Sequence, residues 1–286
     1  MAYDAARGQV VLFGGLDAFG SNLNDTWTWD NGWVQRRTAA TPPYRYDASM
    51  VYDVAHRVVV LFGGCCAGLD TAALNDTWTW DGAGWTEQHP VVSPSARSQA
   101  TMAYDPGSRL VLLFGGETFP DLSSTNDLWA WDGAAWTQLT PASPPSPRAY
   151  PGLVHDARTD GLLLFGGYRA PAPPNDTWSW DGARWTQLSP AVSPPARYNP
   201  ALAQDPARGQ VVLFGGEYLG QPLADTWIWD GTGWSERHPA HQPPARQDAS
   251  IAYAAGRRAV LLFGGFGAVT RLDDTWLWDG TAWLEW

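Results

Sequence analysis

Arginine recurs at one fixed place in a repeating pattern along the chain. Each of five arginines lies 18 residues before the first glycine of a Phe-Gly-Gly tripeptide. These residues are Arg45, Arg97, Arg148, Arg197 and Arg246. A guanidinium group binds a carboxylate, sulfate or phosphate through paired hydrogen bonds, so five of them together would form an anion site. Because all five recur identically, we favour the alternative that each arginine bonds its own repeat, to a carbonyl or a repeated aspartate.

A second set of residues, two positions after each arginine, differs from repeat to repeat. This position is always polar and is occupied by Asp47, Gln99, Tyr150, Asn199 and Asp248. The residue directly after each arginine also varies, and so do the residues after the glycines, which include Glu117, Tyr168 and Glu217. A scaffold role predicts the same residue in every repeat, so the variation favours a mixed polar and aromatic site for a small ligand or a peptide. Neutral drift at an exposed position is the alternative.

These residues belong to a sequence that repeats about every fifty residues. Phe-Gly-Gly occurs six times, with steps of 49, 52, 51, 49 and 49 residues between the first glycines. The first glycines are Gly14, Gly63, Gly115, Gly166, Gly215 and Gly264. A unit of this length cannot bury its own faces, so we expect each repeat to stack on its neighbours.

Four short β-strands are expected in each repeat, as the second repeat illustrates. Residues 46–53 form the first segment, and 58–62 form a continuous apolar run typical of a strand covered on both faces. Residues 76–81 alternate in character, and 85–88 are the most polar, as expected for an outer edge. In the fourth and fifth repeats, Pro151 and Pro200 fall within the first segment, which predicts that this segment is an edge strand.

Tryptophan is expected to supply the packing between repeats. The chain has 19 tryptophans, and 18 of them occur as three per repeat. A binding stripe of aromatic residues is one interpretation. Because every repeat has the same three, we favour a structural role, in which each buried ring contributes on the order of 4–6 kcal/mol before entropy is subtracted.

Together these motifs resemble kelch repeats. Phe-Gly-Gly ends one strand, an aromatic pair lies in the next, and tryptophan begins the last, in the bacterial style Asn-Asp-Thr-Trp-x-Trp-Asp-Gly-x-x-Trp. The resemblance covers the whole chain. It implies an all-β fold, a six-bladed β-propeller with one blade of four antiparallel strands per repeat and the first strand innermost. We therefore expect a single domain over residues 1–286, with blades at approximately 1–38, 39–90, 91–141, 142–190, 191–239 and 240–286.

The first repeat departs from the others at its start. Met1 aligns with Met50 and Met102 in mid-strand, so we expect the first inner strand to be truncated. The ring would then close by side-chain packing, with no strand exchanged between the ends of the chain. A trimmed natural chain, a mispredicted start and an engineered chain are the three explanations.

Length variation locates the expected binding face. The spacing from the first glycine to the first tryptophan of a repeat ranges from 12 to 15 residues, so the variation lies in the loop after Phe-Gly-Gly. In an antiparallel blade this loop shares a face with the start of the inner strand, and loops carry function on a fixed scaffold. We call these inner-strand starts and post-glycine loops the mouth face.

Composition narrows the classes of partner. The chain has 18 arginines, no lysine and a formal net charge of −11, which argues against nucleic acid and excludes lysine Schiff bases. No apolar run predicts a membrane span, and no secretory signal follows Met1. The five histidines do not pair at metal-ligand spacing, so we expect no metal and no cofactor. Cys65 and Cys66 are adjacent, and we favour free thiols over a strained bridge between them.

Three functions are compatible with these patterns. We favour a monomeric, non-catalytic scaffold that binds a small polar ligand, a glycan or a peptide on the mouth face. The alternative enzyme is a sugar mutarotase resembling the kelch-type N-acetylneuraminate epimerases, in which a carboxylate or a histidine would move a proton beside arginines that bind the sugar acid. Asp47 and Asp248, expected on either side of the first blade, are candidates for an acid/base pair or for a cation site between them. The third possibility is a structural or engineered propeller without a ligand.

Overall fold

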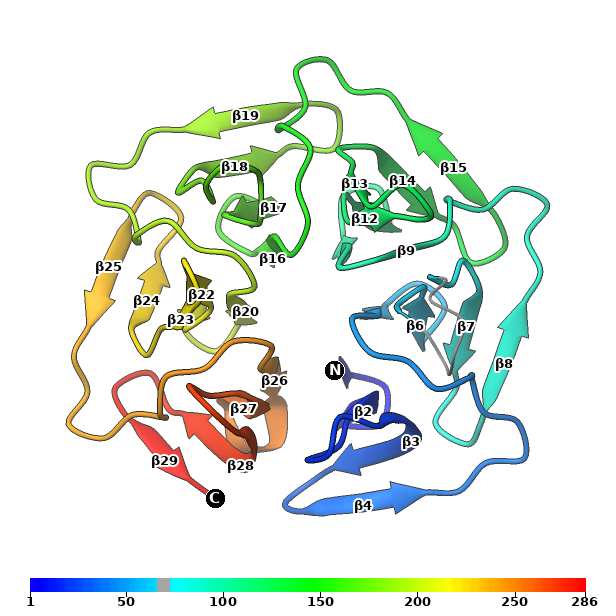
Figure 1. Cartoon of the computed structure of the whole chain (residues 1–286), viewed down its shortest axis with the longest axis horizontal. Coiled ribbons are helices and arrows are strands. Elements are labelled where there is room, and N and C mark those ends of the chain that lie inside the picture. The colour runs from blue at the N-terminus through cyan, green and yellow to red at the C-terminus, as the bar shows by residue number, and fades with distance from the viewer. Residues whose placement is uncertain (66–72) are drawn as a thin grey trace. The chain divides into compact units, whose positions relative to one another are not determined.

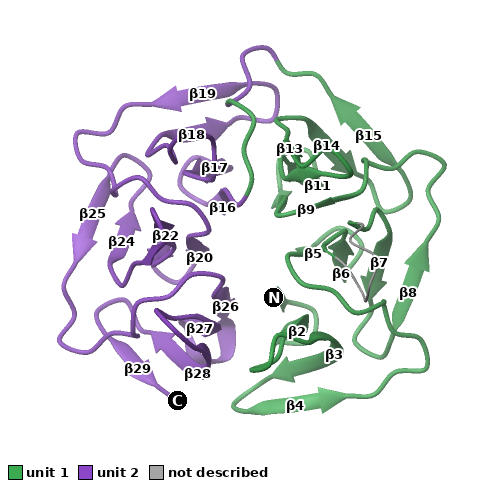
Figure 2. Cartoon of the chain, viewed as in Figure 1, with its two compact units in different colours: residues 1–141, 146–149 green, residues 142–145, 150–286 purple. Residues whose placement is uncertain are grey.

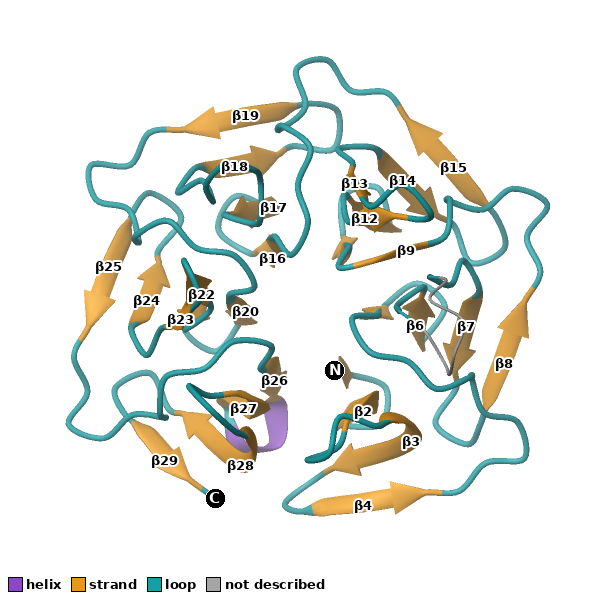
Figure 3. Cartoon of the chain, in the orientation of Figure 1, coloured by secondary structure: helices purple, strands orange, loops and turns teal. Residues whose placement is uncertain are grey.

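The regular secondary structure of the chain consists almost entirely of antiparallel β-sheets joined by turns and loops (Figure 1). The structure is a computed structural model that describes residues 1–65 and 73–286. The helix in the described residues is one 3-10 turn, η1 (Ala255–Arg257), between two strands of the last repeat (Figure 3). No helix in these described ranges is long and apolar enough to cross a membrane. The chain divides into two compact units, residues 1–141 with 146–149 and residues 142–145 with 150–286 (Figure 2).

Unit 1 contains three four-stranded sheets, each with its strands in chain order. The first sheet consists of β1 (Ala2–Asp4), β2 (Gln9–Leu16), β3 (Asn22–Trp29) and β4 (Trp33–Arg36). The second consists of β5 (Ser49–Asp53), β6 (Val58–Phe62), β7 (Thr77–Trp80) and β8 (Trp85–Gln88). The third consists of β10 (Thr101–Asp105), β11 (Leu110–Phe114), β14 (Leu128–Trp131) and β15 (Trp136–Leu139). A small sheet of β9 (Arg97–Ser98), β12 (Glu117–Thr118) and β13 (Ser123–Ser124) accompanies it.

Unit 2 repeats this arrangement with three further sheets. The first consists of β16 (Gly152–Asp156), β17 (Gly161–Phe165), β18 (Thr177–Trp180) and β19 (Trp185–Leu188). The second consists of β20 (Ala201–Asp205), β21 (Gln210–Phe214), β24 (Thr226–Trp229) and β25 (Trp234–Arg237), with the hairpin β22 (Glu217–Tyr218) and β23 (Gln221–Pro222) in its loop. The third consists of β26 (Ser250–Ala254), β27 (Ala259–Phe266), β28 (Arg271–Trp278) and β29 (Trp283–Glu285).

The second strand of the second sheet, β6, is apolar on both faces because it is covered by the first and the third sheets of unit 1. In β6, Val59 and Leu61 pack with residues of the first sheet, whereas Val60 and Phe62 pack with residues of the third. All four side chains are buried. The alternation of a strand thus sends successive residues into two different cores, which confirms the interpretation of the continuous apolar run.

Tryptophan joins each sheet to the one before it within a unit. The indole Nε1 of Trp85 donates a hydrogen bond to Thr26 Oγ1 at 2.9 Å, and Trp283 Nε1 donates to Thr226 Oγ1 at 2.9 Å. The Trp85 ring also meets Phe13 edge-on, with centroids 5.2 Å apart. These rings are buried. These contacts confirm the expected structural role of tryptophan in packing one sheet against the next within a unit.

A further contact between sheets explains the glycine of the Asp-Gly turns. A Cβ atom on Gly82 would lie 1.9 Å from Arg7 Nε, and one on Gly280 would lie 2.0 Å from Arg208 Nε. In both cases the arginine comes from the preceding sheet. A side chain in the turn would displace this arginine. Glycine therefore leaves room for the arginine side chain of the preceding sheet to pack over the turn.

Three expectations about strand limits were wrong. The first strand of the second repeat begins at Ser49 rather than at residue 46, because Asp47 has a positive φ of 54° that interrupts an extended strand. Similarly, Pro151 precedes β16 and Pro200 precedes β20, and neither lies inside its strand. In the first repeat, Phe-Gly-Gly does not end the strand: β2 continues through it, with a register shift between Phe13 and Gly15 that is typical of a β-bulge.

Candidate functional site

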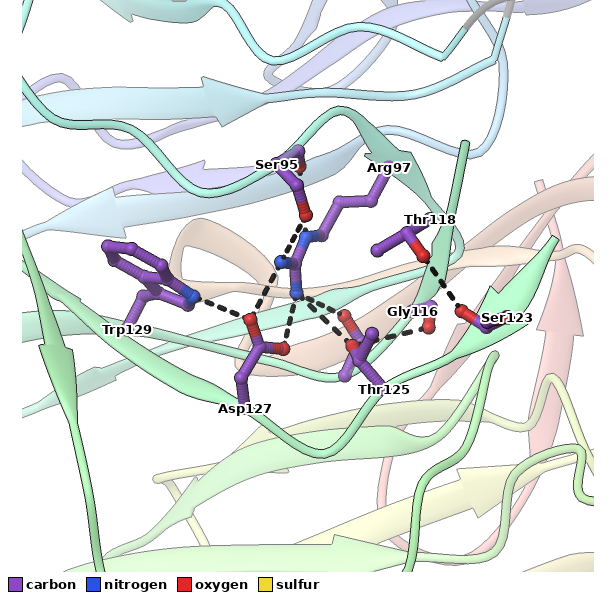
Figure 4. Close-up of polar contacts among 9 residues, drawn as sticks. Ser95, Arg97, Gly116, Thr118, Ser123, Thr125, Asp127 and Trp129 are labelled. Carbon is purple, nitrogen blue, oxygen red and sulfur yellow. Dashed lines mark hydrogen bonds and ion pairs between the residues drawn. The ribbon is translucent and has the colours of Figure 1, made fainter. Parts of the chain in front are cut away.

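The repeated arginine is a structural element of its own repeat, as Arg97 shows (Figure 4). Its side chain is 1% exposed, and Nη1 and Nη2 donate to Asp127 Oδ1 and Oδ2 at 2.6 and 2.7 Å. Nη1 also donates to the carbonyl of Gly115 at 3.0 Å. Asp127 in turn accepts a hydrogen bond from Trp129 Nε1 at 2.7 Å. One carboxylate therefore holds the arginine and the first tryptophan of the repeat together.

The same clamp recurs in three other repeats. The pairs are Arg45 with Asp76, Arg197 with Asp225 and Arg246 with Asp274, all closed by N–O distances of 2.6–2.7 Å. Arg148 is also buried, and its Nε donates to the carbonyl of Ser146 at 3.0 Å. Four of the five guanidinium groups thus bond an aspartate and a glycine carbonyl of their own repeats, as we favoured from the sequence. These four do not offer an anion site.

Electrostatics within the clamp favour the charged carboxylate. Burial raises the pKa of Asp225, but the hydrogen bonds and charge of Arg197 outweigh burial and lower that pKa below its ordinary value of 3.8. The pKa values of Asp127 and Asp274 are lowered for the same reasons. These three carboxylates are therefore ionised near neutral pH.

Each arginine also fixes the start of its inner strand through its backbone. The carbonyl of Arg97 accepts a hydrogen bond from Gly64 N at 2.9 Å, so this carbonyl oxygen contacts the glycine pair of the preceding repeat. A Cβ atom on Gly63 would lie 2.6 Å from this same oxygen, and the φ of Gly63 is +63°. Only glycine meets both conditions. The Phe-Gly-Gly repetition therefore follows from the close approach of the next repeat.

The variable polar position has one backbone conformation in all five repeats. The φ angle is +54° at Asp47, +62° at Gln99, +52° at Tyr150, +56° at Asn199 and +57° at Asp248. Asparagine and aspartate tolerate this left-handed region, but tyrosine and glutamine are rarely found there. The backbone is further held between repeats: Gln99 N donates to the carbonyl of Asp47 at 3.0 Å, and Asn199 N to that of Tyr150 at 2.9 Å.

In unit 2 the variable residues form one cluster on the mouth face. The ring of Tyr198 lies 6.0 Å from that of Tyr150 and 5.5 Å from that of Tyr168, measured between centroids. The Asn199 amide donates a hydrogen bond to the Asp248 carboxylate. Tyr198 also pairs through its backbone with Glu217, at 3.0 and 2.9 Å. We call Tyr150, Tyr168, Tyr198, Glu217 and Asp248 the tyrosine–acid cluster.

The pKa values of two side chains in this cluster, Tyr198 and Asp248, are raised. Burial raises the pKa of Tyr198, and a hydrogen bond to Glu217 and the negative charges of Glu217 and Asp248 raise it further. Burial and the charge of Glu217 also raise the pKa of Asp248, while Asn199 and Arg271 oppose the rise. Solvent reaches Asp248 and screens these charges, so the rise is smaller than full burial would produce. The carboxyl groups of Glu217 and Asp248 thus lie close enough to act on each other electrostatically.

Unit 1 contributes a different set of residues to its own part of the mouth face. Glu117 lies in β12 and pairs with Ser98 of β9, and burial raises its pKa. Ser98 Oγ is buried without a hydrogen-bond partner among the described residues. Cys65 pairs by a β-bridge with Tyr46, whereas Cys66 lies outside the described residues, so the predicted state of this cysteine pair stays a prediction.

The expected site residues are divided between the two units. Tyr150, Tyr168, Asn199, Glu217 and Asp248 belong to unit 2. Asp47, Gln99 and Glu117 belong to unit 1. The central position of Tyr198 was not predicted, although the variation directly after each arginine was its signal. Within the described residues, no three His, Cys, Asp or Glu side chains group as metal ligands.

Comparison with known proteins identifies the family of the chain. Residues 107–286, more than half of the chain, match the KLHDC2/KLHL20/DRC7 Kelch-repeats domain. No curated protein matches the chain significantly. The matched region includes parts of both units, and the unmatched first repeats carry the same Phe-Gly-Gly, Asp-Thr-Trp and arginine features. The chain belongs to the kelch-repeat family.

Proposed function

We propose that the chain is a non-catalytic interaction scaffold that binds its partner on the mouth face of a six-bladed propeller. Kelch repeats generally mediate protein interactions. The observation that carries the proposal is the left-handed backbone at the variable position. Glycine is the least strained residue there, yet all five complete repeats have polar side chains at this position. At Gln99 and Tyr150 the side chain is kept against backbone preference, and this supports a role in contacting a partner.

The six-bladed ring is part of this proposal. Each of the six repeats contributes one four-stranded sheet in the described residues, and tryptophan–threonine bonds link successive sheets inside each unit. We propose that the same packing continues around a single domain with the blade limits given above, without an exchanged strand.

A peptide-display screen tests the interaction function. Wild-type chain is used to enrich peptides, and each enriched peptide is measured against Tyr168→Ala and Leu284→Ala. Both side chains are large and exposed, but Leu284 lies on the last strand of its sheet, away from the mouth face. We expect Tyr168→Ala to weaken binding and Leu284→Ala to leave it unchanged. Equal effects of the two variants, or no enriched peptide and no thermal shift with glycans or sugar acids, would contradict the proposal.

The mutarotase alternative receives less support. Its single favourable observation is the raised pKa of Asp248. A sugar acid would need arginine groups for its carboxylate, and Arg45, Arg97, Arg197 and Arg246 are already bonded within their repeats. We therefore do not propose an enzyme. A propeller without any ligand is the outcome that a failed screen would favour.

A further inference from the structure

On the basis of the interaction function proposed above, we infer that the tyrosine–acid cluster binds the guanidinium or ammonium group of a basic peptide side chain. The opposite charge would have followed from the less favoured interpretation of the arginine series, as an anion site. The geometry places four of those arginines inside the fold and leaves carboxylates and tyrosine rings on the mouth face. Three properties of the cluster point to a cation.

The first property is a buried carboxylate that lacks a basic partner. Glu217 is only 8% exposed. Its side chain interacts with the hydroxyl of Tyr198, and among residues 1–65 and 73–286 no arginine or histidine forms an ion pair with it. Buried carboxylates are normally paired with a cation or with several N–H donors. A cationic ligand would supply the missing charge.

The second property is the arrangement of aromatic rings beside this carboxylate. The ring of Tyr198 contacts those of Tyr150 and Tyr168, with ring planes inclined by 41° and 75°. Tyr168 is 42% exposed, so its ring is available to a partner. A guanidinium or ammonium group is attracted to the face of such a ring. The same unit contains an internal example: Arg271 Cζ lies 5.7 Å from the centroid of Phe266.

The third property is the balance of charge around the cluster. Glu217 and Asp248 act on each other electrostatically, and Arg271 is the basic side chain that offsets Asp248. Arg197 and Arg246 are neutralised by Asp225 and Asp274. The whole chain has a net charge of −11. A positive ligand is therefore attracted from a distance, and an acidic ligand is repelled.

Four short synthetic peptides test the inference by fluorescence anisotropy. They are identical except for one central residue, which is arginine, lysine, citrulline or glutamate. We expect the arginine and lysine peptides to bind, the citrulline peptide to bind about tenfold more weakly, and the glutamate peptide to bind more weakly still. Affinity for the arginine peptide should fall as salt is raised.

Two substitutions locate the binding. Glu217→Gln should weaken the arginine peptide about tenfold and leave the citrulline peptide unchanged. Glu236→Gln removes the same charge from the exposed strand β25 of the same unit, and should change neither. Tyr168→Leu, at an exposed ring, should weaken the arginine and lysine peptides without affecting the fold. Thermal melts confirm that each variant is folded.

The outcomes separate this inference from the proposed function. If the citrulline or glutamate peptide binds as tightly as the arginine peptide, and Glu217→Gln has no effect, the cation inference is wrong. The interaction function then still stands if Tyr168→Ala weakens the peptides enriched by display. If display enriches no peptide and glycans and sugar acids give no thermal shift, the interaction function itself has failed.

Discussion

Two positions that lie two residues apart in each complete repeat behave in opposite ways. Arg97 is buried and makes the same contacts as Arg45, Arg197 and Arg246. Gln99 has the same backbone conformation as the residues at the equivalent position of the other repeats, but the side chain at this position differs between successive repeats. Contacts that recur identically hold the sheets together, whereas a shared backbone with different side chains leaves the surface free to vary. Substitutions at the two kinds of position test this division.

Removing one arginine clamp should have the largest effect. In Arg197→Met, Asp225 keeps its place but loses its bidentate partner, so we expect the free energy of unfolding to fall by about 3 kcal/mol. The matched control is Arg184→Met, because Arg184 and its partner Asp181 are 74% and 53% exposed in the same unit. The control should lose no more than about 1 kcal/mol. Denaturant unfolding measures both, and equal losses would show that the clamp is not a structural element.

Acid should weaken the clamps together. The pKa values of Asp127, Asp225 and Asp274 are lower in the folded chain than the ordinary value of 3.8. Their contribution to stability is therefore complete above that unfolded-state value and is lost as pH falls through the lower folded pKa. We expect the melting temperature to change little from pH 7 to 5 on account of these groups, and to drop below about pH 4.

The Arg197→Met variant checks the origin of this acid sensitivity. Asp225 without its arginine no longer has a lowered pKa, so the variant should lose less stability between pH 5 and pH 3 than the wild type does. A loss as large as in the wild type would assign the acid effect to groups other than the clamp of Asp225.

Breaking one bond between sheets should have an intermediate effect. Thr226→Val keeps the shape of the side chain but removes the acceptor of the Trp283 indole, and both residues are fully buried. A buried donor left unsatisfied costs about 1–3 kcal/mol. Thr186→Val is the control, because Thr186 is exposed on the outer strand β19. Thermal or denaturant unfolding should separate the two variants, and an unchanged Thr226→Val would remove this bond from the scaffold.

The sequence predicted the scaffold better than the site, for a physical reason. The apolar run at Val58–Phe62 and the tryptophan spacing are local patterns that report strands directly. The backbone conformation of Asn199 does not depend on local sequence alone, because its backbone N–H donates a hydrogen bond to the carbonyl of Tyr150 in another repeat. This also explains why the predicted first strand began too early. Likewise, nothing local shows that Arg7 packs over Gly82 of the next sheet.

The site was predicted in its parts but not in its charge. Variation at Asn199 and Glu217 marked them as candidates, whereas the identical arginines were open to two interpretations. The charge exposed at this surface depends on whether the guanidinium of Arg197 is paired with a carboxylate. Its partner, Asp225, lies 28 residues away along the chain. Such pairings require the folded sheet, so the sign of the mouth face in unit 2 could be assigned only from the structure.

The smallest effect should come from the variable position itself. Gln99→Gly should stabilise the chain by about 0.5 kcal/mol, because the left-handed conformation strains glutamine more than the added freedom of glycine costs. Asn199→Gly should bring no gain, since asparagine tolerates this conformation and its amide bonds to Asp248. Gln138→Gly is the control, because Gln138 is exposed in the extended strand β15 of the same unit as Gln99, and there glycine should cost about 0.5–1 kcal/mol.

The sign of the Gln99→Gly effect decides what the variable position is. A gain means that the glutamine side chain is held against the preference of the backbone, and a requirement outside the fold is then needed to explain why a polar residue stands there. A loss as large as that of Gln138→Gly would mean that the side chain supports the fold. In that case the difference between the arginine and its neighbour two residues on would no longer separate scaffold from binding surface.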